Sequence, residues 1–253
     1  MARLVLGNTD ASGTGRGWIA PTAIQPRFAS FFLGGTLGAN MALGGADAAS
    51  IGAPTLEAGV IGKELPHLVT KGGANFLRTA IAEPREGTFF SIARMPAPPG
   101  AAPLGTTDGP LMGLYNSGNL MMLLTNAGIG GAFRTRMPEQ QPEGWNTVPP
   151  VLADMTRWGL YALRYQNNGA SVTGVAKAYT ANRTASRTGS VAGAVSPAGI
   201  EIGSQPFSDS SDMQKGIAHQ AAVMIWDVAL SDAEMENVAS LLRRWSARYG
   251  VTV

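Results

Sequence analysis

The chain contains an apolar strand that runs directly into a capped helix, and this junction limits the possible folds more than any other feature. The run Ala222–Leu230 is apolar apart from one aspartate, which suits a buried strand. Ser231 follows as a favourable N-cap, and Glu234 stands three residues on, where its carboxylate can reach back to the backbone N–H of the cap. Leu230 can pack on Met235 as a hydrophobic staple. We therefore expect a buried strand and a helix that begins directly after it.

A helical spacing of apolar residues continues after this cap. The apolar residues that fall on one helical face are Met235, Val238, Leu241, Leu242 and Trp245. Gly250 then provides a natural stop. The sequence therefore predicts one amphipathic C-terminal α-helix over residues 231–249, packed against a body made of strands.

Upstream of the helix, segments with strand character alternate with turn residues. Gly87–Met95 is a strong strand candidate, and Trp158–Tyr165 alternates in polarity. The turn residues Asn167–Gly169 connect the latter to Ser171–Tyr179, which predicts a hairpin. The 33 glycines and 16 prolines suit many tight turns. The sequence therefore predicts an all-β fold, an antiparallel β-sandwich with one C-terminal α-helix, over residues 65–253.

Residues 1–64 differ in composition from the rest of the chain. Glycine and alanine dominate them, as in Leu33–Gly45, and Arg27–Leu33 has the character of a strand. Such a segment cannot easily build a core alone, because glycine costs ordering entropy and adds no side chain. We therefore expect residues 1–64 either to form an assembly arm that packs on a neighbouring subunit or to supply early strands and a long loop of the same sandwich.

The charge of the chain is low and evenly spread. Charged residues make up 14% of the 253 residues, against about 25% in typical domains, and the formal net charge is +2. There is no long block of basic residues, and Arg243, Arg244 and Arg248 suit the negative end of the predicted helix dipole. We therefore expect no nucleic-acid partner.

No segment has the features of a secretion signal or a membrane span. The first residues lack the apolar core of a signal peptide, and no uncharged apolar run reaches the roughly 18 residues that a membrane helix needs. The absence of cysteine excludes disulfides and thiolate sites. We therefore expect a protein made in the cytoplasm, without membrane insertion.

The residue patterns of common catalytic centres are missing from the sequence. Its two histidines, His67 and His219, lie in apparent strands among small or apolar residues, where a structural or surface role is expected. The acidic run Asp232–Glu236 has the spacing of a glycosidase carboxylate pair, but it opens the predicted helix, where acids complement the dipole and build the cap. We therefore assign no catalytic residue and expect a protein that is not an enzyme.

Two loops carry the remaining candidates for a metal ion or a ligand. Ser208–Asp212 offers carboxylates to a hard cation such as Ca²⁺, but such loops are usually turns, so no metal ligand and no cofactor are assigned. Trp145 lies in a loop, residues 137–150, that is rich in proline, glutamate and glutamine. Its ring can stack on a sugar, anchor a subunit contact or fold back on its own sandwich. Trp145 is therefore the candidate for a ligand or interface contact.

The second half of the chain carries a motif that is typical of one superfamily. A glycine-flanked strand precedes a strand that ends in an aromatic residue and an acid, followed by Ala-Leu-Ser and a glutamate. The matching residues are Ile200–Gly203, Ile225–Asp227, Ala229–Ser231 and Glu234. The chain therefore resembles the laminin-G-like, concanavalin A-like lectin/glucanase modules over about residues 65–253. The resemblance implies a jelly-roll sandwich but little about function, because this fold carries lectins, glycosidases and assembly proteins.

Versions of this module that lack catalytic residues and cysteine, and that are rich in alanine and glycine, are similar to those in tailed-phage virion proteins. The resemblance implies a non-enzymatic structural protein of the virion, in its tail, fibre, baseplate or capsid surface. Its partners would be copies of itself and other virion proteins. The alternative is a carbohydrate-binding or host-receptor-binding module whose partner is a host surface glycan. A glycan binder needs an exposed aromatic residue beside converging polar groups in a cleft, which separates the two interpretations.

Overall fold

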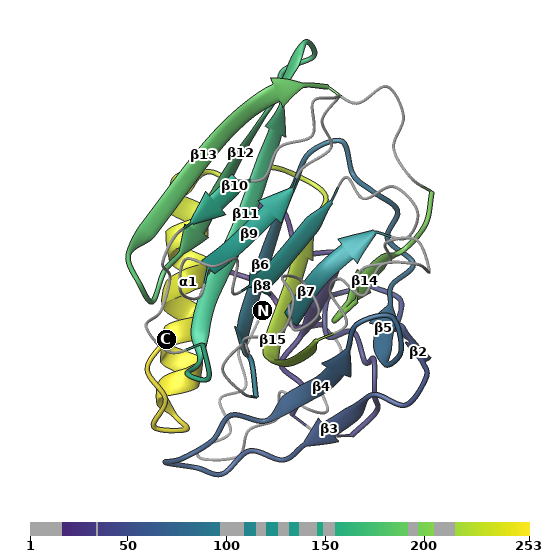
Figure 1. Ribbon diagram of the computed structural model, residues 1–253, viewed down its shortest axis with the longest axis vertical. Helices are drawn as coiled ribbons and strands as arrows, with labels where there is room; N and C mark the ends of the chain where they lie inside the picture. Colours follow the sequence, from purple (N-terminus) through teal and green to yellow (C-terminus); the bar gives the residue numbers. More distant parts are fainter. Residues whose placement is uncertain are drawn as a thin grey trace.

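Two antiparallel sheets pack face to face, and a helix covers the outer face of the first (Figure 1). The computed structural model describes residues 17–33, 35–96, 109–114, 120–125, 132–136, 146–148, 155–191, 197–204 and 216–253. Within these ranges, the predicted all-β sandwich with a C-terminal helix is confirmed.

The first sheet has eight strands and carries the helix. Its order is β13 (Arg183–Ser190), β12 (Ser171–Ala178), β11 (Gly159–Asn167), β6 (Gly87–Arg94), β15 (Ile217–Trp226), β4 (His67–Lys71) and β3 (Thr55–Glu57), and β1 (Phe28–Ser30) also pairs with β15. β11 and β12 form the predicted hairpin, with Tyr165 opposite Gly174. Gly169 in their turn has a φ of +86°, a left-handed conformation that glycine adopts without steric cost.

The second sheet has seven strands, all paired antiparallel in the described ranges. Its order is β10 (Asn146–Val148), β9 (Ala132–Arg136), β8 (Met121–Thr125), β7 (Gly109–Leu114), β14 (Ile200–Ile202), β5 (Phe76–Arg78) and β2 (Ala49–Ile51). β14 carries the glycine-flanked motif, and its two isoleucines are buried between the sheets. The motif therefore marks a central strand of the second sheet.

Two apolar clusters hold these layers together. Between the sheets, alternate residues of β12 such as Val172 and Ala176 belong to the same buried cluster as Phe89 of β6. On the outer face of the first sheet, Phe90 and Trp226 lie in the cluster that includes the apolar side of the helix. β6 and β15 are thus covered on both faces, which explains why they are apolar almost throughout rather than alternating.

The helix α1 (Asp232–Ala247) begins at the predicted cap. The backbone N–H of Glu234 donates to Oγ of Ser231 at 3.3 Å, and the backbone N–H of Ser231 donates to Oε2 of Glu234 at 2.9 Å. Both halves of the capping box are therefore present. α1 ends at Ala247, before the predicted residue 249, and Gly250 follows with a φ of +71°.

The apolar face of α1 is buried as its spacing predicts, except for Leu241, which is half-buried. Its buried residues are Met235, Val238, Ala239, Leu242, Trp245 and Ser246. Three tryptophans, Trp158, Trp226 and Trp245, are also buried. In the described ranges, no helix combines the length and the apolar character that crossing a bilayer requires.

Three strands of the sandwich, β1, β2 and β3, come from the segment before residue 65. Trp18 lies 5.5 Å from Phe31, and Phe31 lies 5.1 Å from Trp245 on α1, measured between ring centroids. Nε1 of Trp226 donates to the carbonyl of Ile24 at 3.0 Å. The described part of this segment therefore packs on both β15 and α1. An assembly role for residues 1–64 stays a prediction.

Candidate functional site

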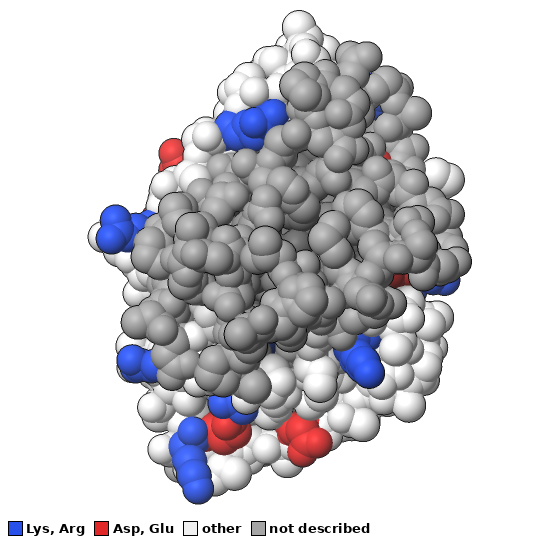
Figure 2. Space-filling view, viewed as in Figure 1, with Lys and Arg blue, Asp and Glu red and all other residues white. Residues whose placement is uncertain are grey.

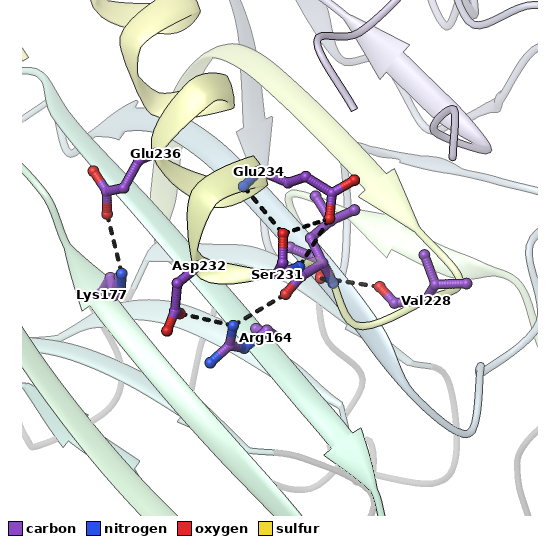
Figure 3. A network of polar contacts seen from close by, with 9 residues as sticks. Arg164, Lys177, Val228, Ser231, Asp232, Glu234 and Glu236 are labelled. Atoms are coloured by element: carbon purple, nitrogen blue, oxygen red, sulfur yellow. Dashed lines mark hydrogen bonds and ion pairs between the residues drawn. The ribbon is translucent and has the colours of Figure 1, made fainter. Parts of the chain in front are cut away.

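The candidates from the sequence lie in different places. Trp145 and the Ser208–Asp212 loop lie outside the described residues, so their roles stay predictions. The acids at the start of α1 have partners in the fold. Oδ1 of Asp232 accepts from Nη1 of Arg164 at 2.8 Å, and Glu236 pairs with Lys177 on β12 (Figure 3). These contacts fix α1 to the first sheet, in agreement with a structural role for the acidic run.

A pocket of about 560 Å³ opens at the end of the sandwich where β15 finishes and β6 begins. Four segments that are distant in sequence form it. They are residues 26–27 before β1, residues 43–46, residues 80–82 with Pro84 between β5 and β6, and Asp227 after β15. We call this the rim pocket. Its volume lies within the range of about 300–1,000 Å³ that is usual for small-molecule sites.

Arg27 and Asp227 supply the charged groups of the rim pocket. The backbone N–H of Arg27 donates to the carbonyl of Ile225 at 2.8 Å, which holds it beside the end of β15. Nε of Arg27 lies 3.6 Å from Oδ2 of Asp227, and the two side chains are 63% and 40% exposed. At this distance and exposure, both groups can still bind a ligand. The guanidinium can donate several hydrogen bonds, and the carboxylate can accept them.

Asn40 holds one wall of the rim pocket in place, although it does not line it. Its Oδ1 accepts from the backbone N–H groups of Ala29 at 3.0 Å and Ala42 at 2.9 Å. Its Nδ2 donates to the carbonyls of Arg27 at 2.9 Å and Ala46 at 3.0 Å. The side chain therefore ties the loop of residues 42–46 to β1. It is 3% exposed, so water cannot easily replace these bonds.

Gly45 fits the same arrangement. A Cβ atom at this position would lie 2.1 Å from Nδ2 of Asn40 and 2.8 Å from the carbonyl oxygen of Arg27. A larger residue would therefore displace the amide that shapes the loop. This gives a physical reason for a glycine in this wall.

A second group of polar residues, which we call the histidine cluster, lies on the outer face of the first sheet. His67 and His219 stack with ring centroids 4.5 Å apart and an interplanar angle of 24°. Arg94 lies 4.5 Å from the ring centroid of Trp158, which itself packs against His67. Glu64 connects the cluster, because it pairs with Arg94 at 3.1 Å and accepts from Nε1 of Trp158 at 2.8 Å.

The histidine cluster favours neutral imidazoles. Burial lowers the pKa of both His67 and His219, and it lowers that of His219 to about 4, with His67 and Arg94 adding to the effect. Nδ1 of His67 lies 2.8 Å from the carbonyl oxygen of Leu65, so a neutral His67 carries its proton on Nδ1 and donates it to this carbonyl. The pair thus sits in the fold uncharged at neutral pH.

Neither the rim pocket nor the histidine cluster has the features of a metal centre or a hydrolytic centre among the described residues. Among the residues that the structure describes, no three His, Asp or Glu side chains are arranged to hold a metal ion. Asp227 is the one carboxylate among the described residues that line the rim pocket, whereas a glycosidase needs two facing its cleft. On the described part of the face in Figure 2, lysine and arginine side chains stand apart from one another.

Sequence reasoning did not find the rim pocket. Its walls are largely glycine, alanine and proline, which carry no side-chain chemistry to search for. Asn40 did leave a signal, because it is the one amide in the Gly/Ala-rich run of residues 37–45. The stacking of His67 on His219 left no signal in the sequence, because it depends on the pairing of β4 with β15.

The chain matches no protein-family model, and no curated protein matches it in sequence. Solved structures do match it in fold. The binding domain of botulinum neurotoxin serotype G has a TM-score of 0.54 at 8% identity, covering 89% of this chain and 54% of that one. The binding domain of Paraclostridial Mosquitocidal Protein 1 has a TM-score of 0.51 at 12% identity, covering 90% and 55%.

A further structure of the serotype G toxin, described as its receptor binding domain, has a TM-score of 0.53 at 7% identity. This chain spans about half the length of each of these matched chains. At such low identity the likeness establishes the fold alone. The comparisons therefore confirm a β-sandwich, and the three matched structures described above are binding domains. The tailed-phage assignment stays a prediction.

Proposed function

We propose that this chain is a non-catalytic binding module whose rim pocket holds a neutral saccharide. The observation that carries the proposal is the convergence of Arg27 and Asp227 over a pocket of about 560 Å³. The fold likeness to receptor-binding domains of toxins supports a binding role in general. It does not identify the ligand, so the ligand class comes from the chemistry of the pocket.

The charges of the pocket favour an uncharged polyol. Arg27 and Asp227 cancel, so neither an anion nor a cation gains from long-range attraction. A pair of neighbouring sugar hydroxyls fits both groups, because the carboxylate accepts from one hydroxyl and the guanidinium donates to the other. Leu43, which is 68% exposed, and Pro84 supply apolar surface for the C–H groups of a sugar.

The pocket departs from the expected glycan site in one respect. No aromatic side chain is among the described residues that line it, so the apolar contact comes from aliphatic groups. Aliphatic contact gives weaker packing than a tryptophan face. We therefore expect affinities in the weak range that suits several copies binding together on one surface.

On this proposal, the saccharide belongs to a cell surface and the module is a receptor-binding part of a tailed-phage particle. The resemblance of the sequence to virion proteins supports a place in a phage particle. The likeness of the fold to a receptor-binding domain supports a role in receptor binding. The localisation in a virion rests on that resemblance.

Substitution of the charged pair tests the pocket. A saccharide is first selected by binding the full chain to an array of neutral and acidic glycans, and its Kd is then measured by calorimetry. Arg27→Ala and Asp227→Asn should each weaken binding about 10- to 100-fold, because each removes a hydrogen bond to a charged group. Arg157→Ala, which alters an exposed arginine outside the pocket, should bind like the wild type. Equal affinity in all four proteins would rule out this pocket as the saccharide site.

A second candidate function, assembly with copies of the same chain, is favoured by a different observation. Large apolar side chains stand exposed in the segment before residue 65. They are Ile19 (59%), Ile24 (52%), Leu43 (68%), Val60 (51%) and Ile61 (83%). Val60 and Ile61 form the tip of a tight turn, closed by two backbone hydrogen bonds of 2.8 Å between Val60 and Glu64. Apolar side chains presented on such a turn are suited to burial in a protein contact.

The mass of the chain in solution tests this second candidate. If Val60 and Ile61 bind a second copy, the wild type should form a defined oligomer at micromolar concentration, measured by sedimentation equilibrium. The double substitution of Val60→Ser and Ile61→Ser should give a folded monomer. The control is Ile217→Ser, which changes an exposed isoleucine on β15. A wild type that stays monomeric at all concentrations would refute assembly through this turn.

A further inference from the structure

A small pocket of about 160 Å³ lies between the β12–β13 hairpin and α1, away from the rim pocket. Lys177 of β12, Tyr179 and Asn182 of the turn, and Thr184 of β13 line one side. Glu236 and Arg243 of α1 line the other, and Arg183 and Ala178 complete the lining. We call it the helix pocket. It is therefore built by three elements that the fold holds in fixed positions.

The helix pocket carries an excess of positive charge. Its lining contains three basic residues, Lys177, Arg183 and Arg243, and one acid, Glu236. Glu236 pairs with Lys177 at 3.1 Å across the gap between β12 and α1 (Figure 3). Among the described residues, no aspartate or glutamate side chain forms an ion pair with Arg183 or Arg243. The formal charge of the lining is thus +2, from three positive groups and one negative group.

Two of these cations are held in place before any ligand arrives. Arg243 donates from Nε to the main-chain oxygen of Val253 and from Nη2 to the carbonyl of Tyr179, both at 3.2 Å. Its guanidinium carbon also lies 5.6 Å from the centroid of the Tyr179 ring, and Nζ of Lys177 lies 5.5 Å from it. The Tyr179 ring is thus in contact with one cation from β12 and one from α1. Donors fixed in this way lose little entropy when they bind a ligand.

Tyr179 does not offset this charge. Burial raises the pKa of its hydroxyl, and the nearby Glu236 carboxylate raises it further, so the phenol stays neutral at physiological pH. Asn182 is held in a left-handed conformation with a φ of +50°, and its backbone N–H donates to the carbonyl of Tyr179 at 3.1 Å. The amide side chain of Asn182 therefore adds an uncharged hydrogen-bonding group to the lining.

We infer that the helix pocket binds a small oxyanion, namely a carboxylate, sulfate or phosphate group, between Lys177 and Arg243. The anion gains charge-assisted hydrogen bonds from both cations. It also relieves the uncompensated positive charge of the lining. Glu236 competes with it for Lys177, so this carboxylate tunes the affinity. The inference is independent of the saccharide site, because the two pockets share no lining residue.

The test is an NMR titration of the full chain with sodium sulfate, sodium phosphate, sodium acetate and sodium glucuronate, each compared with sodium chloride at equal ionic strength. We expect saturable shifts of the amides of residues 177–184 and of the last turns of α1. Glucuronate binding more tightly than acetate would identify an acidic sugar as the source of the group, and equal binding would identify a free anion. Both results support the site, and the absence of saturable shifts with any of the four salts would overturn it.

Three variants and a matched control assign the site to its residues. Arg243→Gln and Lys177→Gln should each weaken binding about tenfold, because each removes one charge-assisted contact. Glu236→Gln should tighten binding several-fold, because it frees Lys177. Arg244→Gln changes the neighbouring, exposed arginine and should have no effect. If Arg243→Gln fails to fold, Glu236→Gln still decides the matter, because unchanged or weaker binding in that variant would overturn the inference.

Discussion

Replacing Asn40 by alanine is expected to lower the free energy of unfolding by about 3 kcal/mol and to abolish saccharide binding in the rim pocket. The substitution leaves two buried N–H groups and two partly buried C=O groups without their side-chain partner. Each such group costs about 1–3 kcal/mol when water cannot reach it. The loop of residues 42–46 then loses its attachment to β1, so the wall that carries Leu43 is no longer fixed.

Urea denaturation of the wild type, Asn40→Ala and Asn40→Asp measures this effect. Asn40→Asp matches the shape of the amide and keeps the acceptor for Ala29 and Ala42, but loses the donor to Arg27 and Ala46. Its stability should therefore fall between those of the other two proteins. A loss of less than about 0.5 kcal/mol in Asn40→Ala would mean that the loop is held by other contacts.

Lowering the pH from 6.5 to 4 is expected to cost about 1–2 kcal/mol of stability through His219, because its partial exposure to water reduces the full effect of the lowered pKa. The ordinary pKa of a histidine is 6.5, and that of folded His219 is about 4. Between these values the unfolded chain binds more protons than the folded chain, so stability falls as the pH is lowered. The stability that neutral His219 contributes is fully present above pH 6.5. It is lost as the pH falls from 6.5 to the pKa of His219 in the folded chain, about 4. Protonation is opposed by burial, by the stacked His67 and by Arg94.

The charged groups around His67 and His219 have opposing effects on the protonation of the two imidazoles. Arg94 disfavours a second positive charge, whereas Glu64 favours it, and Glu57 on β3 also favours protonation of His67. Acidic side chains in general also take up protons toward pH 4. The effect of His219 is therefore measured as the difference between the free energies of unfolding of the wild type and His219→Gln. The free energy of unfolding of wild type and His219→Gln should diverge between pH 6.5 and 4, with the variant less sensitive to acid. Parallel curves would show that His219 does not keep a lowered pKa.

Local signals in the sequence predicted the parts of the fold that depend on neighbouring residues. The cap at Ser231 needs only Glu234 three positions away, and the hairpin of β11 and β12 needs only the turn at Asn167–Gly169. The spacing of Met235 and its partners likewise fixed the buried face of α1. In each case the interacting groups lie close together in the chain.

The candidate sites depend on long-range pairing, which the sequence did not reveal. The rim pocket forms because β1 pairs with β15 and brings Arg27 beside Asp227. The helix pocket forms because α1 crosses the end of β12, which places Arg243 against Tyr179. The sequence explained Arg243 by the helix dipole, and the structure adds its two carbonyl partners. No residue pattern within a single segment predicts the contact of Arg27 with Asp227 or that of Arg243 with Tyr179.

The measurement that tests the central claim most directly is an NMR titration of the full chain with the neutral saccharide selected on the glycan array. If the rim pocket holds the saccharide, saturable shifts will be confined to residues 26–27, 43–46, 80–84 and 227, and they will be lost in Arg27→Ala. Shifts that centre on another part of the molecule and persist in Arg27→Ala would contradict it.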